Sequence, residues 1–158
     1  MHFTSLISAA LALASGVYSI PKHSFDTKDF TTSSVCGDTS WNLNSNAKAP
    51  LVSDCEKLEQ DMQKHRNKGF YLYGWQQDKD DKFMPLAYEG SCVFGVKVLD
   101  ANNAPAVIAS GDVADIVHDA MKSYTNGNQV SAVMGTMSCG AYWGDFSKQG
   151  IAWSIYAW

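Results

Sequence analysis

The sequence lacks the close residue spacings by which metal sites are usually identified. It contains neither C-x-x-C nor H-x-x-x-H, the patterns typical of zinc sites. Its cysteines instead stand 19, 37 and 47 positions apart. No Asn-x-Ser/Thr sequon occurs either, so N-glycosylation has no acceptor. The missing spacings predict a protein with no metal site and no cofactor.

An excess of positive charge is also missing. The chain has 12 Lys and Arg against 16 Asp and Glu, a net charge of −4, and the two signs are interspersed. Nucleic acids and anionic membranes usually bind a basic patch. After the N-terminal leader, no second apolar run is long enough to span a bilayer. We therefore expect no nucleic-acid partner and no stable membrane insertion.

The leader itself is the first positive signal. Residues 6–17 carry no charge and are rich in Ala and Leu, which is typical of the apolar region of a secretory signal. Cleavage after Ser19 places small residues at the expected sites, and cleavage after Gly16 is the alternative. The sequence predicts a signal peptide over residues 1–19 and a secreted, extracellular protein.

The remaining chain has the size of one domain. Residues 20–34 are polar and lack apolar periodicity, so we expect a flexible N-terminal arm. Residues 35–158 are rich enough in apolar side chains to form a single core. The four cysteines in this part form an even set, typical of structural disulfides outside the cell: Cys36, Cys55, Cys92 and Cys139.

Two helices are predicted from apolar periodicity. The first begins near Ser53, which has capping-box spacing to Glu56, and ends at Gly69; its apolar stripe is Cys55, Leu58 and Met62. The second is capped by Asp112 and ends at the turn 126–128. Its stripe consists of Val113, Ile116, Val117, Ala120, Met121 and Tyr124.

Strand-like runs lie between and after the helices: Phe70–Trp75, Cys92–Leu99 with alternate residues on one face, Val130–Cys139 and Ile151–Tyr156. The order of elements predicts a small, disulfide-stapled α+β domain of two layers. Its mainly antiparallel sheet has four to five strands, and two helices cover one face in a split β-α-β arrangement. A β-sandwich is the weaker alternative, because it leaves the second helix without a place.

Four cysteines allow three disulfide connectivities. The first turn of the first helix can lie over the start of the strand at Cys92, which favours Cys55 with Cys92. Cys36 would then pair with Cys139.

Catalytic groups are few. His118, with Asp115 and Asp119 nearby, is the one His/Asp grouping, and we interpret it as a solvated helix face; His23 and His65 are isolated. The acidic loop 76–82 is interrupted by lysines and lacks the distal Glu of a calcium loop, so it is interpreted as a hairpin turn. The sequence predicts no catalytic residue.

The aromatic residues are better candidates for binding. Trp153 alternates with Ile155 and is expected in the core, while Tyr156 and Trp158 share the other face of the last strand. We predict that Tyr142, Trp143 and Trp158 contribute to a binding surface.

An ordered set of short motifs runs through nearly the whole mature chain. It comprises Cys36-Gly37, Asp54-Cys55, the run 90–96, Gly111-Asp112-Val113, the run 135–139 and the run 153–156. In this order they resemble the fungal putative necrosis-inducing factor family, the Ecp-type secreted effector domain. The resemblance implies a small cysteine-stapled effector associated with host necrosis or virulence. It further implies an architecture similar to the killer toxins of smut-fungus viruses, and it brings no catalytic residues.

The leading hypothesis is therefore a secreted, non-enzymatic effector that binds a host extracellular or cell-surface protein. The alternative is a killer-toxin-like antimicrobial against competing microbes. A secreted hydrolase or ribonuclease, with His118 as its base, is the third hypothesis.

Overall fold

The computed structural model describes residues 28–29, 33–72, 83–99, 106–140 and 148–158. Several sequence predictions lie outside these residues: the signal peptide, His23, the loop 76–82, and the binding candidates Tyr142 and Trp143. They stay predictions.

A five-stranded sheet forms one layer of the molecule, in the order β2-β9-β10-β5-β4, and every neighbouring pair is antiparallel. Its strands are β2 (Asn42–Leu43), β4 (Met84–Glu89), β5 (Cys92–Val98), β9 (Val133–Cys139) and β10 (Gln149–Tyr156). A second sheet contains β1 (Lys28–Asp29), β3 (Lys68–Leu72) and β6 (Ala106–Ala109). The short hairpin β7 (Thr125–Asn126) and β8 (Gln129–Val130) follows the second helix.

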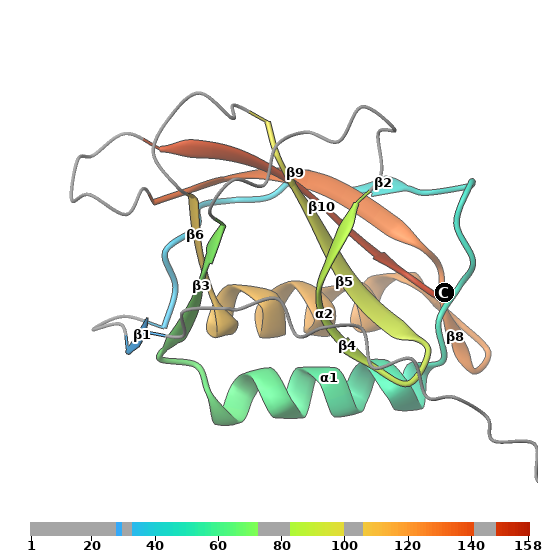
Figure 1. The fold of residues 1–158 in the computed structure, drawn as a ribbon. Coiled ribbons are helices and arrows are strands. Elements are labelled where there is room, and N and C mark those ends of the chain that lie inside the picture. The colour runs from blue at the N-terminus through green and yellow to red at the C-terminus, as the bar shows by residue number, and fades with distance from the viewer. Residues whose placement is uncertain (1–27, 30–32, 73–82, 100–105, 141–147) are drawn as a thin grey trace, which may run out of the picture.

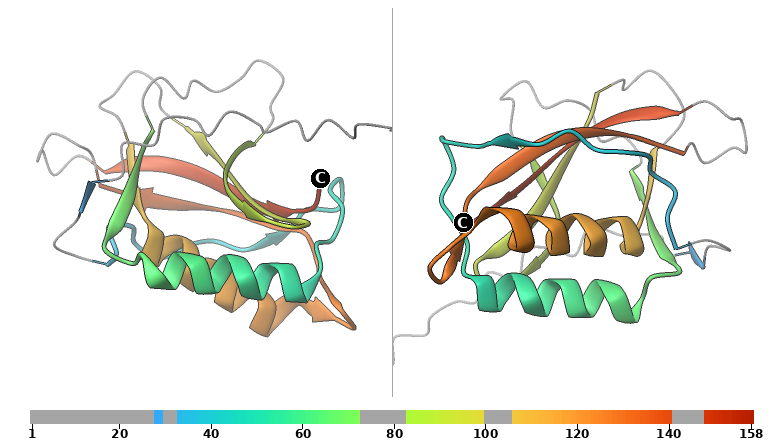
Figure 2. Two further views of the ribbon diagram at one scale, coloured as in Figure 1. Left: turned by 60° about the horizontal axis from the view of Figure 1, so that its bottom comes forward. Right: turned by 180° about the vertical axis from the view of Figure 1, so that it is seen from behind.

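Two helices form the other layer: α1 (Val52–Lys64) and α2 (Ser110–Tyr124). They run antiparallel beside each other and cover the same face of the five-stranded sheet, as Figure 1 and the rear view in Figure 2 show. The prediction of an α+β domain with two helices on one face of a mainly antiparallel sheet is confirmed.

The core lies between these layers. The predicted stripe of α1 is buried, and four of the six stripe residues of α2 are buried while Met121 and Tyr124 pack partly against the core. Trp153, the largest fully buried side chain, stacks on Phe94 with ring centroids 6.1 Å apart. Both aromatic rings face the helices, so the expectation that Trp153 packs in the core is confirmed.

The prediction for β5 was incomplete. All seven residues of this strand are buried, not only the alternating set that faces the helices. On the opposite face, Phe83 and Tyr156 lie against Gly95, where an added Cβ would come within 2.9 Å of each. Side chains therefore cover both faces of β5, which hides the alternation expected of a half-buried strand.

The helix α1 starts at Val52, close to the predicted start near Ser53, but its predicted cap and its predicted end were wrong. Leu51 occupies the N-cap position and no side chain caps the helix, so Ser53 and Glu56 form no capping box. At the other end the helix stops at Lys64, and Gly69 lies inside β3 opposite Ala109 of β6. At the start of the helix a tertiary contact replaces the local cap, because the Val52 N–H donates to the Asn128 carbonyl at 2.9 Å.

The predicted arm includes four described residues. Lys28 and Asp29 pair with β3, and Ser33 and Ser34 approach the first turn of α2. These residues contact the domain, and the division at residue 34 stays a prediction.

Candidate functional site

The first disulfide joins Cys55, in the first turn of α1, to Cys92 at the start of β5, and both residues are fully buried. Beside it, Asp54 Oδ2 accepts hydrogen bonds from the backbone N–H and the hydroxyl of Ser91, both at 2.8 Å. These bonds lower the pKa of the Asp54 carboxyl from its usual value, the backbone bond contributing most. We call Asp54, Cys55, Ser91 and Cys92 the α1 clamp.

The turn before Ser91 requires a glycine. Gly90 has a φ of 52°, and a Cβ at this position would lie 2.4 Å from Cγ of Asp54. The Ser91 hydroxyl in turn accepts the backbone N–H of Leu51 at 2.9 Å, which supplies a partner for the N-cap residue of α1. The three residues Gly90-Ser91-Cys92 therefore each contact the start of α1. Gly90 leaves room for Asp54, Ser91 hydrogen-bonds to Asp54 and Leu51, and Cys92 forms the disulfide with Cys55.

The second disulfide joins Cys36 to Cys139 at the end of β9. The two residues are directly opposite each other, with Gly37 N–H donating to the Ser138 carbonyl and Gly140 N–H donating to the Val35 carbonyl. Both disulfides are therefore the ones that the sequence favoured, Cys55 with Cys92 and Cys36 with Cys139.

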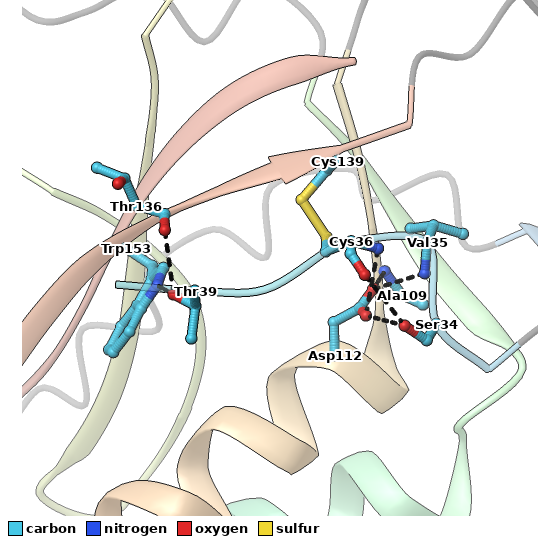
Figure 3. Close-up of a disulfide and its surroundings, with 9 residues drawn as sticks. All are labelled: Ser34, Val35, Cys36, Thr39, Ala109, Asp112, Thr136, Cys139 and Trp153. Atoms are coloured by element: carbon cyan, nitrogen blue, oxygen red, sulfur yellow. Dashed lines mark hydrogen bonds between the residues drawn. A yellow bond between two sulfur atoms is a disulfide. The ribbon is translucent and has the colours of Figure 1, made fainter. Parts of the chain in front are cut away.

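Asp112 of α2 holds the same segment, as Figure 3 shows. Its carboxylate accepts the Ser34 hydroxyl at 2.7 Å and the Val35 N–H at 3.1 Å. We call Ser34, Cys36, Asp112 and Cys139 the α2 clamp. The side chain is buried, so these bonds replace hydration of the carboxylate.

The predicted role of Asp112 as N-cap was wrong. The helix begins at Ser110 with Ala109 as its N-cap, and Asp112 is the third helical residue. Its carboxylate accepts the Ala109 N–H at 3.0 Å, which satisfies that backbone donor from inside the helix. The motif Gly111-Asp112-Val113 is thus a contact between α2 and the segment that precedes β2.

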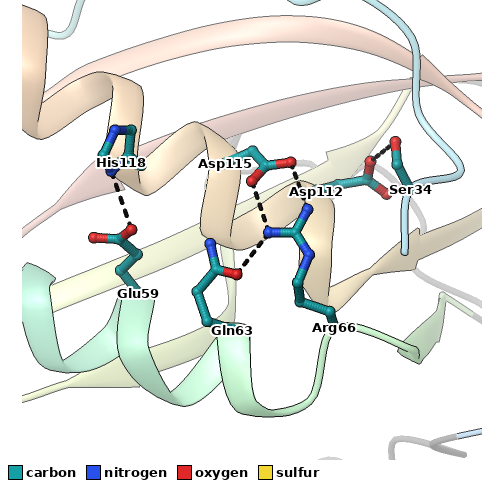
Figure 4. Close-up of polar contacts among 7 residues, drawn as sticks. All are labelled: Ser34, Glu59, Gln63, Arg66, Asp112, Asp115 and His118. Atoms are coloured by element: carbon teal, nitrogen blue, oxygen red, sulfur yellow. Dashed lines mark hydrogen bonds and ion pairs between the residues drawn. The ribbon is translucent and has the colours of Figure 1, made fainter.

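The candidate catalytic group His118 lies on the outer surface of the helical layer, where Figure 4 shows its contacts. Its Nδ1 is 3.1 Å from Oε1 of Glu59 on α1, and 58% of the His118 side chain is exposed. Asp115 is bound by both terminal nitrogens of Arg66 at 3.0 Å. The structure therefore pairs His118 with Glu59 of α1 and Asp115 with Arg66 in the turn after α1, rather than pairing His118 and Asp115 with each other.

The same hydrogen bond from Arg66 to Asp115 raises the pKa of the guanidinium. Within the described ranges, no three His, Cys, Asp or Glu side chains gather closely enough to hold a metal ion. In the same part of the chain, no helix is both long and apolar enough to cross a membrane.

Aromatic side chains gather on the sheet face that points away from the helices. Tyr88 of β4 and Tyr156 of β10 are both register partners of Val93, so the three residues form a row across the sheet. The Trp158 ring lies 5.9 Å from the Tyr88 ring and 6.5 Å from the Tyr156 ring, and both pairs are edge-to-face. We call Tyr88, Tyr156 and Trp158 the aromatic end.

The aromatic end is partly open to solvent. Tyr88 is 44% exposed and Trp158 is 50% exposed. Tyr156 contacts Trp158, donates its hydroxyl to the Phe83 carbonyl at 3.4 Å, and has its pKa raised by burial. Leu51 lies at the same end of the sheet, because its backbone N–H donates to Ser91 in the β4–β5 turn, and its side chain is also exposed. The exposed Trp158 ring thus contacts both tyrosines, the exposed Tyr88 and the less exposed Tyr156.

Among the predicted binding residues, Trp158 is exposed in this structure. Tyr88 was missed, because β4 was not predicted as a strand and the tyrosine therefore had no assigned face. A period-2 pattern would place Leu86 and Tyr88 on the same face, but the register shift between Pro85 and Ala87 leaves Leu86 in the core and Tyr88 exposed.

Comparison with known proteins gives one family. No curated protein matches the sequence. A family model described as "Pathogen effector; putative necrosis-inducing factor" matches residues 35–139. The matched region contains all four cysteines, both clamp aspartates and both helices. Because the match covers more than half of the chain, the protein belongs to this pathogen effector family, Hce2.

Proposed function

We propose that the protein is a secreted, non-enzymatic effector that acts in the extracellular space by binding a host protein, and that host necrosis follows from this contact. The aromatic end is the proposed contact surface. Family membership supports the effector role, and the exposed pair Tyr88 and Trp158 is the observation that carries the binding proposal.

The chemistry of this surface suits protein recognition. Tyr and Trp contribute large apolar contact areas with little loss of side-chain entropy, and they are enriched where binding energy is concentrated. Both rings are partly held before binding, because each makes an edge-to-face contact within the aromatic end. A partner would therefore bury apolar surface without having to order these side chains fully.

The extracellular location is part of the same proposal. Two disulfides are consistent with an oxidising compartment. We propose that residues 1–19 direct secretion and are removed. In this proposal the arm, residues 20–34, precedes the effector domain, residues 35–158, in the mature chain.

The test compares two exposed apolar positions on different parts of the molecule. Oxidised wild-type protein and the variants W158A, Y88A and L43A are infiltrated into leaves of several plant species, and binding to host apoplastic and membrane extracts is measured in parallel. Leu43, on β2, is 63% exposed and serves as the matched control. We expect W158A and Y88A each to lose about tenfold or more in binding, while L43A retains wild-type binding and necrosis.

Three outcomes decide the proposal. Wild-type protein that binds no host extract and causes no cell death in any plant contradicts the effector function. Equal binding by W158A, Y88A and wild type contradicts the assigned surface alone. Growth inhibition of competing fungi or bacteria without any effect on plants would favour the killer-toxin-like alternative.

A further inference from the structure

Residues 33–40 form a strap that crosses from the first turn of α2 to the edge of β9. Backbone hydrogen bonds hold it: Gly37 N–H and Ser40 N–H donate to Ser138 and Thr136 of β9, at 2.9 and 3.0 Å. None of the eight strap residues is buried. Segments with few buried apolar contacts and solvent-exposed hydrogen bonds have the lowest local stability of a fold. The strap is therefore attached chiefly by polar contacts and by the Cys36–Cys139 bond.

The two disulfides differ in access. Cys55 and Cys92 are both fully buried between α1 and the sheet. Cys36 is only partly buried, on the strap, while Cys139 is fully buried. Thiol–disulfide exchange requires a thiolate to reach one of the two sulfur atoms. Cys36 therefore belongs to the more exposed of the two disulfides.

The strap covers two features of the sheet. The Thr39 hydroxyl oxygen accepts the indole N–H of the fully buried Trp153 at 2.6 Å, as Figure 3 shows. The strap also pairs with the outer edge of β9, whose Thr136 N–H donates to the Ser40 hydroxyl at 2.9 Å. If the strap left, the Trp153 indole and the backbone edge of β9 between residues 136 and 140 would lose these partners.

We propose that the strap is a redox-controlled element: selective reduction of Cys36–Cys139 releases residues 33–40 from β9, while Cys55–Cys92 keeps the domain folded. Trp41 marks the end of the released segment, because its ring packs on Trp153 and Tyr124 and stays attached. The freed edge of β9 then presents unpaired backbone groups of the kind that accept an added strand. This regulation is independent of the identity of the host partner.

The step needs a dithiol as reductant. One thiolate of the dithiol attacks Sγ of Cys36, the disulfide bond breaks, and its electron pair passes to Sγ of Cys139, which takes a proton. The second thiol then attacks the mixed disulfide and releases Cys36 as a thiol. Two electrons and two protons pass to the protein, and the dithiol is oxidised to a disulfide.

The experiment titrates the oxidised wild-type protein with dithiothreitol. Free thiols are alkylated and assigned by peptide mass spectrometry, and hydrogen exchange is followed on the same samples. We expect Cys36 and Cys139 to be alkylated first. The amides of Gly37, Ser40 and Gly140 should then exchange about tenfold faster or more, while buried amides of α1 and β5 stay protected.

Two controls keep the result interpretable. The variant C36S/C139S should show the fast exchange at Gly37, Ser40 and Gly140 without any reductant, and reoxidation of the reduced wild type should restore slow exchange. Simultaneous reduction of both disulfides with loss of all protection overturns the proposal. So does alkylation of Cys36 and Cys139 with the strap amides still protected.

Discussion

The α1 clamp and the α2 clamp use the same parts in different surroundings. Each places a disulfide close to an aspartate in the first turn of a helix, and each aspartate accepts hydrogen bonds from the segment that the disulfide attaches. In the α1 clamp that segment is the turn into β5, a strand with every residue buried. In the α2 clamp it is the exposed strap.

The difference separates two uses of a disulfide. Loop-closure entropy alone assigns about 4 kcal/mol to the bond that closes 37 residues and about 5 kcal/mol to the bond that closes 103 residues. That model considers the unfolded chain only. When burial is included, the ranking of the two disulfides by their contribution to stability is reversed. The core depends on the α1 clamp, whereas the strap contributes little apolar packing. The surroundings of the bond therefore decide how much the native state needs it.

The largest expected effect comes from removing one disulfide at a time. C55A/C92A should lose at least about 4 kcal/mol of unfolding free energy, with a further loss from two truncated core side chains. C36A/C139A should lose less, about 3 kcal/mol, because its native state gains strap freedom that offsets part of the entropy term. Urea denaturation followed by circular dichroism measures both. A larger loss in C36A/C139A would contradict the comparison.

Glycine substitutions test the close approach at each clamp. G90A places a methyl group against Asp54 at a positive φ, and we expect a loss of about 2 kcal/mol. At Gly111, an added Cβ would lie 1.8 Å from the Ser33 carbonyl oxygen, so G111A should displace the strap and speed its amide exchange. Gly127 is the control: its φ is 62° and no atom lies within 4 Å of an added Cβ. G127A should cost about 1 kcal/mol, from backbone strain alone.

If G90A and G127A destabilise the protein equally in urea denaturation, packing against Asp54 contributes nothing. The close packing of Gly90 on Asp54 would then not be part of what stabilises the α1 clamp, which would depend on its disulfide and hydrogen bonds alone.

The Asp54 carboxylate makes the α1 clamp sensitive to acid. Its folded pKa lies below the ordinary value near 3.8, so its contribution to stability is complete above that value and is lost as pH falls through the folded pKa. Wild-type protein should therefore lose stability relative to D54N as pH is lowered below about 4. Chemical denaturation at a series of pH values compares the two chains. Parallel curves over this range would mean that Ser91 does not stabilise the ionised carboxylate.

The fold was predictable because its strongest signals are local. The stripes of α1 and α2 identify both helices and their buried faces, and the residues they predict for the core are found there. The strand β6 escaped detection for a physical reason. β6 consists of Ala106–Ala109 directly before α2, so its apolar residues have no turn to separate them from the helix.

The clamps were only half predictable. Family motifs single out Asp54 and Asp112, but no periodicity shows that Asp54 meets Ser91 across 37 positions. Asp112 has the composition of an N-cap, and its true partners, Ser34 and Val35, are more than 70 positions away. Exposure at the aromatic end depends likewise on the register of Tyr88 with Val93, which a bulge in β4 shifts.

The smallest expected effect comes from the hydrogen bond between His118 of α2 and Glu59 of α1. The His118 side chain is 58% exposed and its contact with Glu59 lies at the surface of the helical layer, where such a pair contributes only about 0.5 kcal/mol. H118A should therefore unfold within about 0.5 kcal/mol of wild type and retain full necrosis activity in leaves. Retained activity would remove the one candidate base of a hydrolase. A loss of activity in H118A with unchanged stability would instead move the functional site to the helical layer and contradict the assignment of the aromatic end.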